Sequence, residues 1–134
     1  MEKSFSRNIG SLDDVFEYVE GFISLNSLGD ALAFALKFSV EELFTNMVKY
    51  NPNGQSDISV RLEIRGDILV VQMIDHELVP FDIRESDVTD VTLPSEQREP
   101  GRLGVYLAKR MADTVGFERE GTRSTTTLTF TMRK

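Results

Sequence analysis

A glutamate and an asparagine one helical turn apart have the clearest chemical potential in this sequence. Glu42 and Asn46 belong to the run Glu-Leu-Phe-Thr-Asn, and Lys49 follows them closely. At about 100° per residue, these three side chains lie close together on one side of a helix. An asparagine carbonyl is a hard oxygen ligand for Mg²⁺, and a glutamate beside it could orient or deprotonate an attacking hydroxyl. The alternative is a solvent-exposed helix face without a function.

A second acid, Asp75, ends an apolar strand. It has the parity of Leu69 and Met73, which we assign to the face that the helices cover, so it should lie at the rim of the core. A carboxylate in that position needs hydrogen-bond partners. Turn amides at the end of the strand would serve, and so would the exocyclic amine of adenine. Thr126 has the parity of Leu128, so its hydroxyl should point inward and could bond Asp75, a bound water or the base.

Two glycines, Gly101 and Gly104, open a predicted helix after a long connection. The unpaired amides and the positive dipole end of a helix attract phosphate, and glycine lets the backbone approach an anion closely. Ordinary flexibility at a helix start is the alternative for the glycines alone. Together with Glu42, Asn46 and Asp75, however, they outline a site for ATP and Mg²⁺.

The elements that must position these residues alternate in type along the chain. Ser11-x-x-Asp14 and Ser27-x-x-Asp30 resemble capping boxes that open two helices. The expected helices are residues 11–25, 27–50 and 101–115, and the expected strands are 2–8, 58–64, 68–74, 117–120 and 125–132. This order predicts an α+β fold: a two-layer α/β sandwich whose sheet is antiparallel or mixed, mostly antiparallel, with helices on one face.

Apolar spacing predicts which faces are buried. The second helix should bury the side that carries Val40, Leu43, Phe44, Met47 and Val48. The third helix should bury a stripe formed by Leu103, Leu107, Met111 and Val115. On the outer face of the strand at 68–74 we expect an accessible apolar row formed by Ile68, Val70 and Ile74, which suggests that something covers it.

Residues 76–100 are polar, rich in proline and long for a connection inside one domain. Loops of this length are usually binding loops, so we expect a lid over the site. The chain of 134 residues should form one domain, 1–134. It has no cysteine and no stretch that reads as a signal peptide or a membrane span, and we expect a cytoplasmic protein. A net charge of −7 argues against nucleic-acid and membrane partners and favours protein partners.

The ordered motifs resemble those of the GHKL ATPase superfamily, and within it the small anti-sigma-factor serine kinases. The resemblance covers nearly the whole chain and implies the Bergerat, or histidine-kinase-like ATPase, fold. It implies that Glu42 is the catalytic base, that Asn46 binds Mg²⁺ and that Asp75 reads adenine. The remaining residues that it places at the nucleotide are Lys49, Tyr50, Phe81, Gly101, Arg102, Leu103, Gly104 and Thr126.

Such kinases phosphorylate a serine on a small antagonist protein, hold a sigma factor inactive in the alternative complex, and commonly form homodimers. The resemblance therefore implies these partners, with ATP and Mg²⁺ as cofactors. Glu77 and Arg102 stand where the family usually has glycine, and Ser124 replaces another. These departures favour a second hypothesis, a non-catalytic nucleotide-binding module that regulates by partner switching. The ATPase domain of a histidine kinase is a third, less favoured because we find no separate dimerisation and phosphoacceptor helices.

Overall fold

The computed structural model describes residues 1–51, 54, 56–77, 83 and 102–132, without the side chains of Arg102 and Leu103. Within this part of the chain, five strands form one sheet: β1 (Glu2–Phe5), β2 (Ile58–Arg65), β3 (Ile68–His76), β4 (Thr114–Glu120) and β5 (Arg123–Thr131). The helices there are α1 (Leu12–Leu25), α2 (Asp30–Tyr50) and α3 (Arg102–Met111), and a short 3₁₀ helix, Ile9–Ser11, precedes α1.

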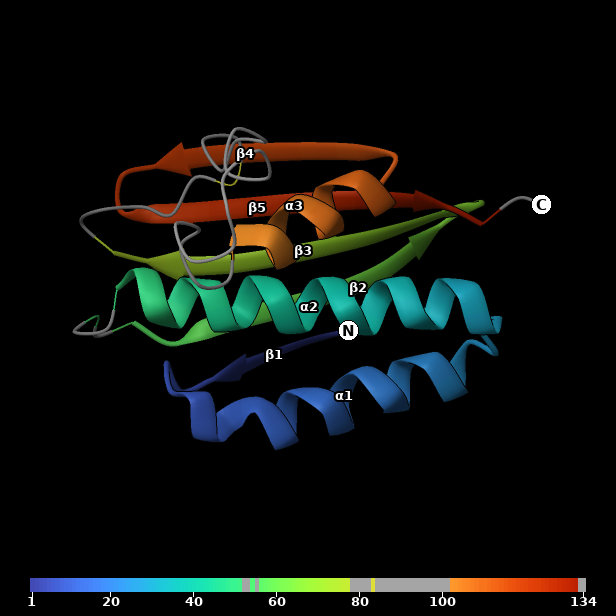
Figure 1. The fold of residues 1–134 in the computed structure, drawn as a ribbon, viewed down its shortest axis with the longest axis horizontal. Coiled ribbons are helices and arrows are strands. Elements are labelled where there is room, and N and C mark those ends of the chain that lie inside the picture. The colour runs from blue at the N-terminus through green and yellow to red at the C-terminus, as the bar shows by residue number, and fades with distance from the viewer. Residues whose placement is uncertain (52–53, 55, 78–82, 84–101, 133–134) are drawn as a thin grey trace.

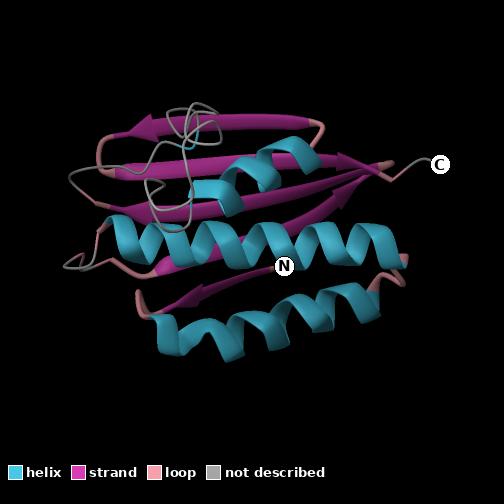
Figure 2. Cartoon of the chain, viewed as in Figure 1, coloured by secondary structure: helices cyan, strands magenta, loops and turns pink. Residues whose placement is uncertain are grey.

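The sheet has the order β1-β2-β3-β5-β4, and all the strand pairings in the described residues are antiparallel. All three described helices lie on the same face of this sheet, with α2 between α1 and α3 (Figure 1). Figure 2 shows the two layers directly, helices in front and strands behind. This confirms the predicted α+β two-layer sandwich, and it makes the sheet antiparallel throughout the described strands.

The core is an apolar layer between the sheet and the helices, formed by the inward-facing residues of the strands and by one side of each helix. Alternate residues of β2, β3 and β5 point at the helices, because successive side chains of a strand face opposite ways. The predicted apolar side of α2 is confirmed, with Val48 half-buried at its margin. The buried residues of these four elements that form the core are Ala35, Leu36, Val40, Leu43, Phe44, Met47, Ile58, Val60, Leu62, Leu69, Val71, Met73, Leu128 and Phe130.

The predicted capping boxes are wrong. Ser11 precedes α1 but its side chain makes no cap hydrogen bond, because the chain already turns there in the 3₁₀ helix that Asn8 caps through the amide of Gly10. Ser27 lies in the connection between α1 and α2 with a φ of 51°, and the N-cap of α2 is Gly29. The two Ser-x-x-Asp patterns correctly predicted that helices follow them. They did not predict which groups accept hydrogen bonds from the first backbone amides of these helices.

The predicted stripe on the third helix is correct only in part: Met111 and Val115 are partly buried and pack against the core, Leu107 does not, and the Leu103 side chain lies outside the described residues. Leu107 is 42% exposed, whereas Val105 and Ala108 are fully buried. The helix ends at Met111 and β4 begins at Thr114, so Val115 belongs to a strand. The buried face is turned toward α2 by a close contact at Gly104, described below, which the spacing of large apolar residues did not indicate.

Of the predicted outer apolar row of β3, only Ile68 is partly exposed. Val70 and Ile74 do lie on the face without helices, but they are 7% and 6% exposed. Their antiparallel neighbours on β2 and β5 cover them: Val70 lies between Glu63 and Thr129, and Ile74 has Ser59 and Thr125 beside it.

Among the described helices, none is long and apolar enough to cross a bilayer.

Tyr18 links α1 to the sheet through a buried hydrogen bond. Its hydroxyl donates to the carbonyl of Val60 at 3.0 Å, and its ring lies edge-on to Phe5 at a centroid distance of 5.7 Å. Burial, reinforced by the nearby charge of Glu2, raises the pKa of Tyr18 to about 12 from 10.0. The folded protein therefore holds this proton more tightly than the unfolded chain does.

We expect Tyr18→Phe to lower the free energy of unfolding by about 1 kcal/mol at neutral pH, because the Val60 carbonyl loses its donor. The folded-state pKa is raised, so this contribution is complete below pH 10.0 and is lost as pH rises toward about 12. Urea unfolding of both proteins at several pH values measures it. A difference that stays constant or grows above pH 10.0 would contradict this account.

Candidate functional site

Glu42 lies where α2 crosses α3. Helical spacing puts it on the flank of α2 that faces α3, together with the buried Ser39 and the half-buried Asn46. The α3 backbone passes so close at Gly104 that a Cβ added there would overlap the Glu42 carboxylate and approach its Cγ to 3.0 Å. Glycine is therefore required at position 104 for this contact. The alternative of a solvent-exposed face therefore holds for Lys49 only, because Glu42 and Asn46 are half-buried.

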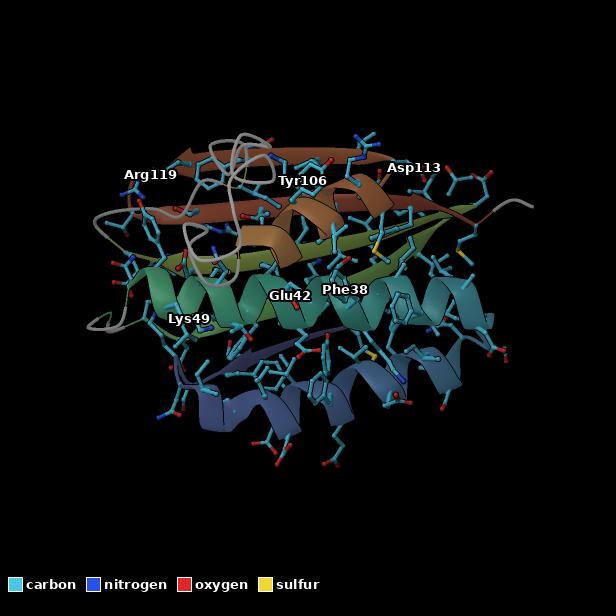
Figure 3. The ribbon with its side chains drawn as sticks, in the orientation of Figure 1. Phe38, Glu42, Lys49, Tyr106, Asp113 and Arg119 are labelled. Carbon is cyan, nitrogen blue, oxygen red and sulfur yellow. The ribbon has the colours of Figure 1, made fainter. Side chains whose placement is uncertain are left out.

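The electrostatics of Glu42 follow from this position. Burial raises the pKa of its carboxyl, the neighbouring Glu41 carboxylate adds to the rise, and Lys49 opposes it. Figure 3 shows Glu42 near the middle of α2 and Lys49 toward its end. Tyr50, the last residue of α2, is 48% exposed. A glutamate with a raised pKa beside a helix N-terminus is suited to proton transfer.

Asp75 is buried at the end of β3, on the inner face as parity predicted, with its side chain 4% exposed. Its carboxylate accepts a hydrogen bond from Nη2 of Arg7, whose own side chain is 3% exposed. Burial raises the pKa of Asp75, and the hydrogen bond and charge of Arg7 oppose the rise. The partner that a buried carboxylate requires is thus an arginine from the segment between β1 and the 3₁₀ helix.

The guanidinium of Arg7 connects several parts of the chain. Nη1 donates to the carbonyl of Met47 in the last turn of α2 at 2.8 Å, and Nε donates to the carbonyl of Ser56 at 3.0 Å. Since Met47 follows Asn46 directly, Arg7 lies between the α2 end of the predicted site and Asp75. The structure therefore does bring the motifs of α2 and β3 together, with Arg7 between them.

Glu77, which stands where the resemblance led us to expect glycine, belongs to the same cluster. Its Oε2 accepts from the amide of Ser56 at 2.7 Å and lies 3.5 Å from Nε of Arg7. Its carbonyl accepts from Arg119 at 2.9 Å. Gly54 packs on the same group, since a Cβ there would lie 2.7 Å from Cδ of Arg7 and 3.0 Å from Cδ of Glu77. One guanidinium thus faces two carboxylates.

Thr126 and Ser124 occupy β5 beside this cluster. In the antiparallel register Asp75 lies opposite Ser124, and Thr126 lies opposite Met73. Both β5 side chains are buried, so the inward orientation predicted for Thr126 is confirmed. Ser124 accepts a hydrogen bond from Nη1 of Arg119 at 3.1 Å, which ties β4 to this end of the sheet.

Several predicted positions lie outside the described residues. Phe81 and Gly101 are among them, and Arg102 and Leu103 are described as the first residues of α3 without their side chains. Of the predicted lid at 76–100, His76 is the last residue of β3, and Ile83 is fully buried in the core. The roles assigned to these positions remain predictions.

The comparison with protein families decides the membership of this chain. The family model for the histidine kinase-like ATPase domain matches residues 5–132. The chain belongs to this family. A domain of this kind binds ATP, usually with Mg²⁺, and the family is associated with ATP-dependent kinase or ATPase activity.

Among solved structures, the fold is similar to that of the Acinetobacter baumannii histidine kinase AdeS, with a TM-score of 0.54 and 14% sequence identity. The match covers 100% of this chain and 68% of that chain. At this identity the similarity concerns the fold alone. No curated protein matches the sequence.

The residues near the crossing of α2 and α3 fit the Mg²⁺ and phosphate part of a nucleotide. Asp75, as it is arranged here, does not fit the base. Near the crossing of α2 and α3, the Asn46 amide oxygen and the Glu42 carboxylate are oxygen ligands of the kind that Mg²⁺ prefers, and they lie beside the start of α3. Within the described residues, no cluster of three or more His, Cys, Asp and Glu side chains could hold a metal ion. At the base end, the Asp75 carboxylate already has Arg7 as its partner.

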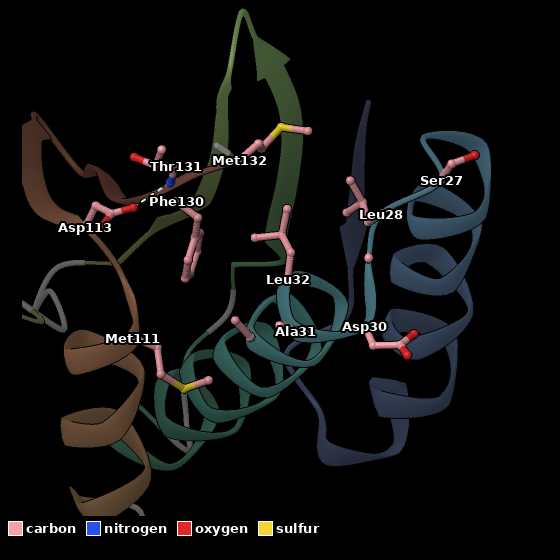
Figure 4. Close-up of a pocket in the computed structure, with 12 residues that line it drawn as sticks. Ser27, Leu28, Asp30, Ala31, Leu32, Met111, Asp113, Phe130, Thr131 and Met132 are labelled. Atoms are coloured by element: carbon pink, nitrogen blue, oxygen red, sulfur yellow. Dashed lines mark hydrogen bonds between the residues drawn. The ribbon is translucent and has the colours of Figure 1, made fainter. Parts of the chain in front are cut away.

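A cavity of about 650 Å³ lies at the opposite end of the helical layer, beside the start of α2 and the end of β5 (Figure 4). It shares no residue with the predicted site and its walls are mainly apolar, so we do not assign the nucleotide to it. Its lining comprises Ser27, Leu28, Gly29, Asp30, Ala31, Leu32, Ala35, Met111, Asp113, Phe130, Thr131 and Met132.

Sequence reasoning missed Arg7. The residue stands alone in a polar segment, Ser6-Arg7-Asn8, and its partner Asp75 is 68 positions away. Neither periodicity nor motif spacing connects two such residues. The single usable signal was that Asp75, placed at the rim of the core by strand parity, requires a partner.

We expect Gly104→Ala to displace the Glu42 carboxylate toward solvent, because the new Cβ would overlap it and a glutamate side chain can rotate away. The pKa of Glu42 should then fall toward the ordinary glutamate value, which carboxyl-detected NMR titration measures. Gly21→Ala is the matched control, since a Cβ there meets nothing within 4 Å. On the exposed face of α1 it should stabilise the protein by about 0.5–1 kcal/mol and leave the Glu42 titration unchanged. An unchanged pKa in Gly104→Ala would contradict the contact.

Proposed function

We propose that this chain is an ATP-dependent serine-protein kinase of the anti-sigma-factor type. Its substrate is a serine of a small antagonist protein, and in the alternative complex it holds a sigma factor inactive, acting as a homodimer. The observation that carries the proposal is Glu42: a half-buried carboxylate with a raised pKa, one turn from Asn46, at the start of α3. The ordered motifs of the whole chain support it, and so does the family match.

In this proposal, ATP supplies the γ-phosphoryl group and Mg²⁺ neutralises phosphate charge. Glu42 accepts the proton of the attacking serine hydroxyl as the serine oxygen forms its bond to phosphorus and the bond to the ADP oxygen breaks. Asn46 contributes its amide oxygen to the metal. The amides at the start of α3, near Gly104, would bind the phosphates. Phosphoryl transfer requires mainly positioning and charge neutralisation, which these groups can supply.

A specific observation favours a second function, a non-catalytic module that regulates by partner switching. The Asp75 carboxylate is engaged by Arg7, and Glu77 fills a position where the family has glycine. Such a chain would keep the fold and bind its partners without transferring phosphate. The two functions differ in phosphate transfer, so they are separated by experiment.

The nucleotide site is tested by ATP and ADP affinity with and without Mg²⁺. We expect Asn46→Ala to weaken ATP binding in Mg²⁺ and to have little effect in EDTA, because the amide oxygen acts through the metal. Asp75→Asn should weaken binding in both, because it alters the acceptor for the adenine amine. Asn26→Ala, the same change at the end of α1, is the control for Asn46→Ala and should bind like the wild type. The nucleotide assignment fails when neither the wild type nor any variant of the chain binds nucleotide, or when a measurable wild-type affinity is unchanged in both variants.

Catalysis is tested with a purified cognate antagonist and radiolabelled ATP. We expect Glu42→Gln to abolish phosphate transfer while ATP still binds, because the amide cannot accept the serine proton. Glu41→Gln, the same change at the preceding residue, should retain transfer, with its pH dependence moved to lower pH because the Glu41 charge helps to raise the pKa of Glu42. Nucleotide binding with no transfer by the wild type would leave the second function.

A further inference from the structure

Arg7 already bonds the carboxylate that the proposed function assigns to the adenine amine. Its Nη2 donates to the Asp75 carboxylate, its Nη1 donates to Met47 beside Asn46, and the Arg7 and Asp75 side chains are 3% and 4% exposed. A ligand donor that is to bond the same carboxylate oxygen must first displace the guanidinium. We propose that Arg7 sets the nucleotide affinity of this domain by competing with the adenine amine for Asp75. This inference rests on the proposed function.

The competition is between two hydrogen-bond donors for one buried acceptor. The buried bond between Arg7 and Asp75 joins two charged groups, whereas the adenine amine offers the same carboxylate a neutral donor, so the arginine is the stronger competitor. Breaking such a pair and leaving either charge unpaired inside the protein is costly. In the domain as described, Asp75 therefore accepts from Arg7, and the adenine amine bonds this oxygen only in the open form, the fraction of molecules in which Arg7 has moved away.

Glu77 provides a second position for the displaced arginine. Its carboxylate already lies 3.5 Å from Nε of Arg7, and with its side chain 12% exposed it is closer to solvent than Asp75. A small movement of the guanidinium from Asp75 toward Glu77 keeps the positive charge paired while it frees the Asp75 carboxylate. The acid at position 77 thus makes the open form accessible in a chain that has an arginine at position 7.

The sign of the effect separates this competition from simple electrostatics. Arg7 is a cation near the proposed site of a polyphosphate, so removing its charge should weaken nucleotide binding if charge alone mattered. Competition predicts the opposite for adenine nucleotides. It also predicts no gain for a nucleotide that lacks the exocyclic amine, because Asp75 then has nothing to accept from the base.

The experiment measures Mg-ATP affinity by calorimetry for the wild type, Arg7→Met and the matched control Arg61→Met. Arg61 lies on β2 and pairs with Glu63 at 3.4 Å, with a side chain 41% exposed. Arg7→Met should bind ATP about tenfold tighter or more, the increase expected when the open form is about 10% populated or less in the wild type. Arg61→Met should bind like the wild type. Purine riboside triphosphate, which lacks the amine, should show no gain with Arg7→Met.

Two further variants keep the result interpretable. Arg7→Met leaves Asp75 without its partner, so circular dichroism and thermal unfolding must show that it is folded at the assay temperature. The double variant Arg7→Met/Asp75→Asn removes both buried charges and folds with less strain on the site. It should bind ATP no tighter than the wild type, because the carboxylate acceptor is gone. Glu77→Gln should bind ATP more weakly than the wild type, because the displaced Arg7 has lost its second carboxylate.

The outcomes separate this inference from the proposed function. Tighter ATP binding by Arg7→Met alone, absent in the double variant and with purine riboside triphosphate, supports the competition, also when the wild type itself binds too weakly to measure. A wild type that binds ATP while Arg7→Met binds equally or more weakly overturns the role of Arg7 and leaves the nucleotide site intact. Absence of binding in every variant overturns both.

Discussion

The apolar layer between the helices and the inner face of the sheet is the constraint on which this structure depends. Burial of apolar surface is the main favourable contribution to folding, and it requires strands with period two to meet helices with period near 3.6. Residues such as Leu62, Val71 and Leu128 from the sheet and Val40 and Phe44 from α2 fill this layer and are almost entirely buried. Polar groups that take part in chemistry can lie only at its ends and along its seams.

Asp75 shows what the end of such a layer demands. Strand parity carries it inward, where a charge without partners would be costly, and the protein supplies Arg7 from a distant segment. The same guanidinium holds the last turn of α2 and the connection before β2. A single buried cation therefore organises the end of the sandwich where we propose that the nucleotide binds. The geometry that stabilises the domain and the geometry that would receive adenine use the same carboxylate.

Glu42 lies at the boundary between two packed helices, α2 and α3. The flank of α2 that faces α3 is neither core nor surface, and the close approach at Gly104 covers part of the carboxylate while leaving the rest accessible. Partial burial raises the pKa of Glu42, and the positive charge of Lys49 limits the rise. A general base benefits from this compromise, because it must release and accept a proton without being locked in either state.

The sequence by itself determined the elements, the two-layer architecture and the residues with chemical potential, because these depend on local periodicity and side-chain chemistry. Parity alone placed Asp75 and Thr126 on the inner face, and helix spacing alone grouped Glu42 with Asn46. The sequence did not determine the buried face of α3, where the absence of a Cβ at Gly104 outweighs the large apolar side chain of Leu107. It also did not determine that Val70 and Ile74 are buried by their cross-strand neighbours. Above all, only the tertiary structure decided that Arg7 is the partner of Asp75. A contact between residues 68 positions apart leaves no local pattern, because it exists only once β1, α2 and β3 have been brought to the same end of the fold.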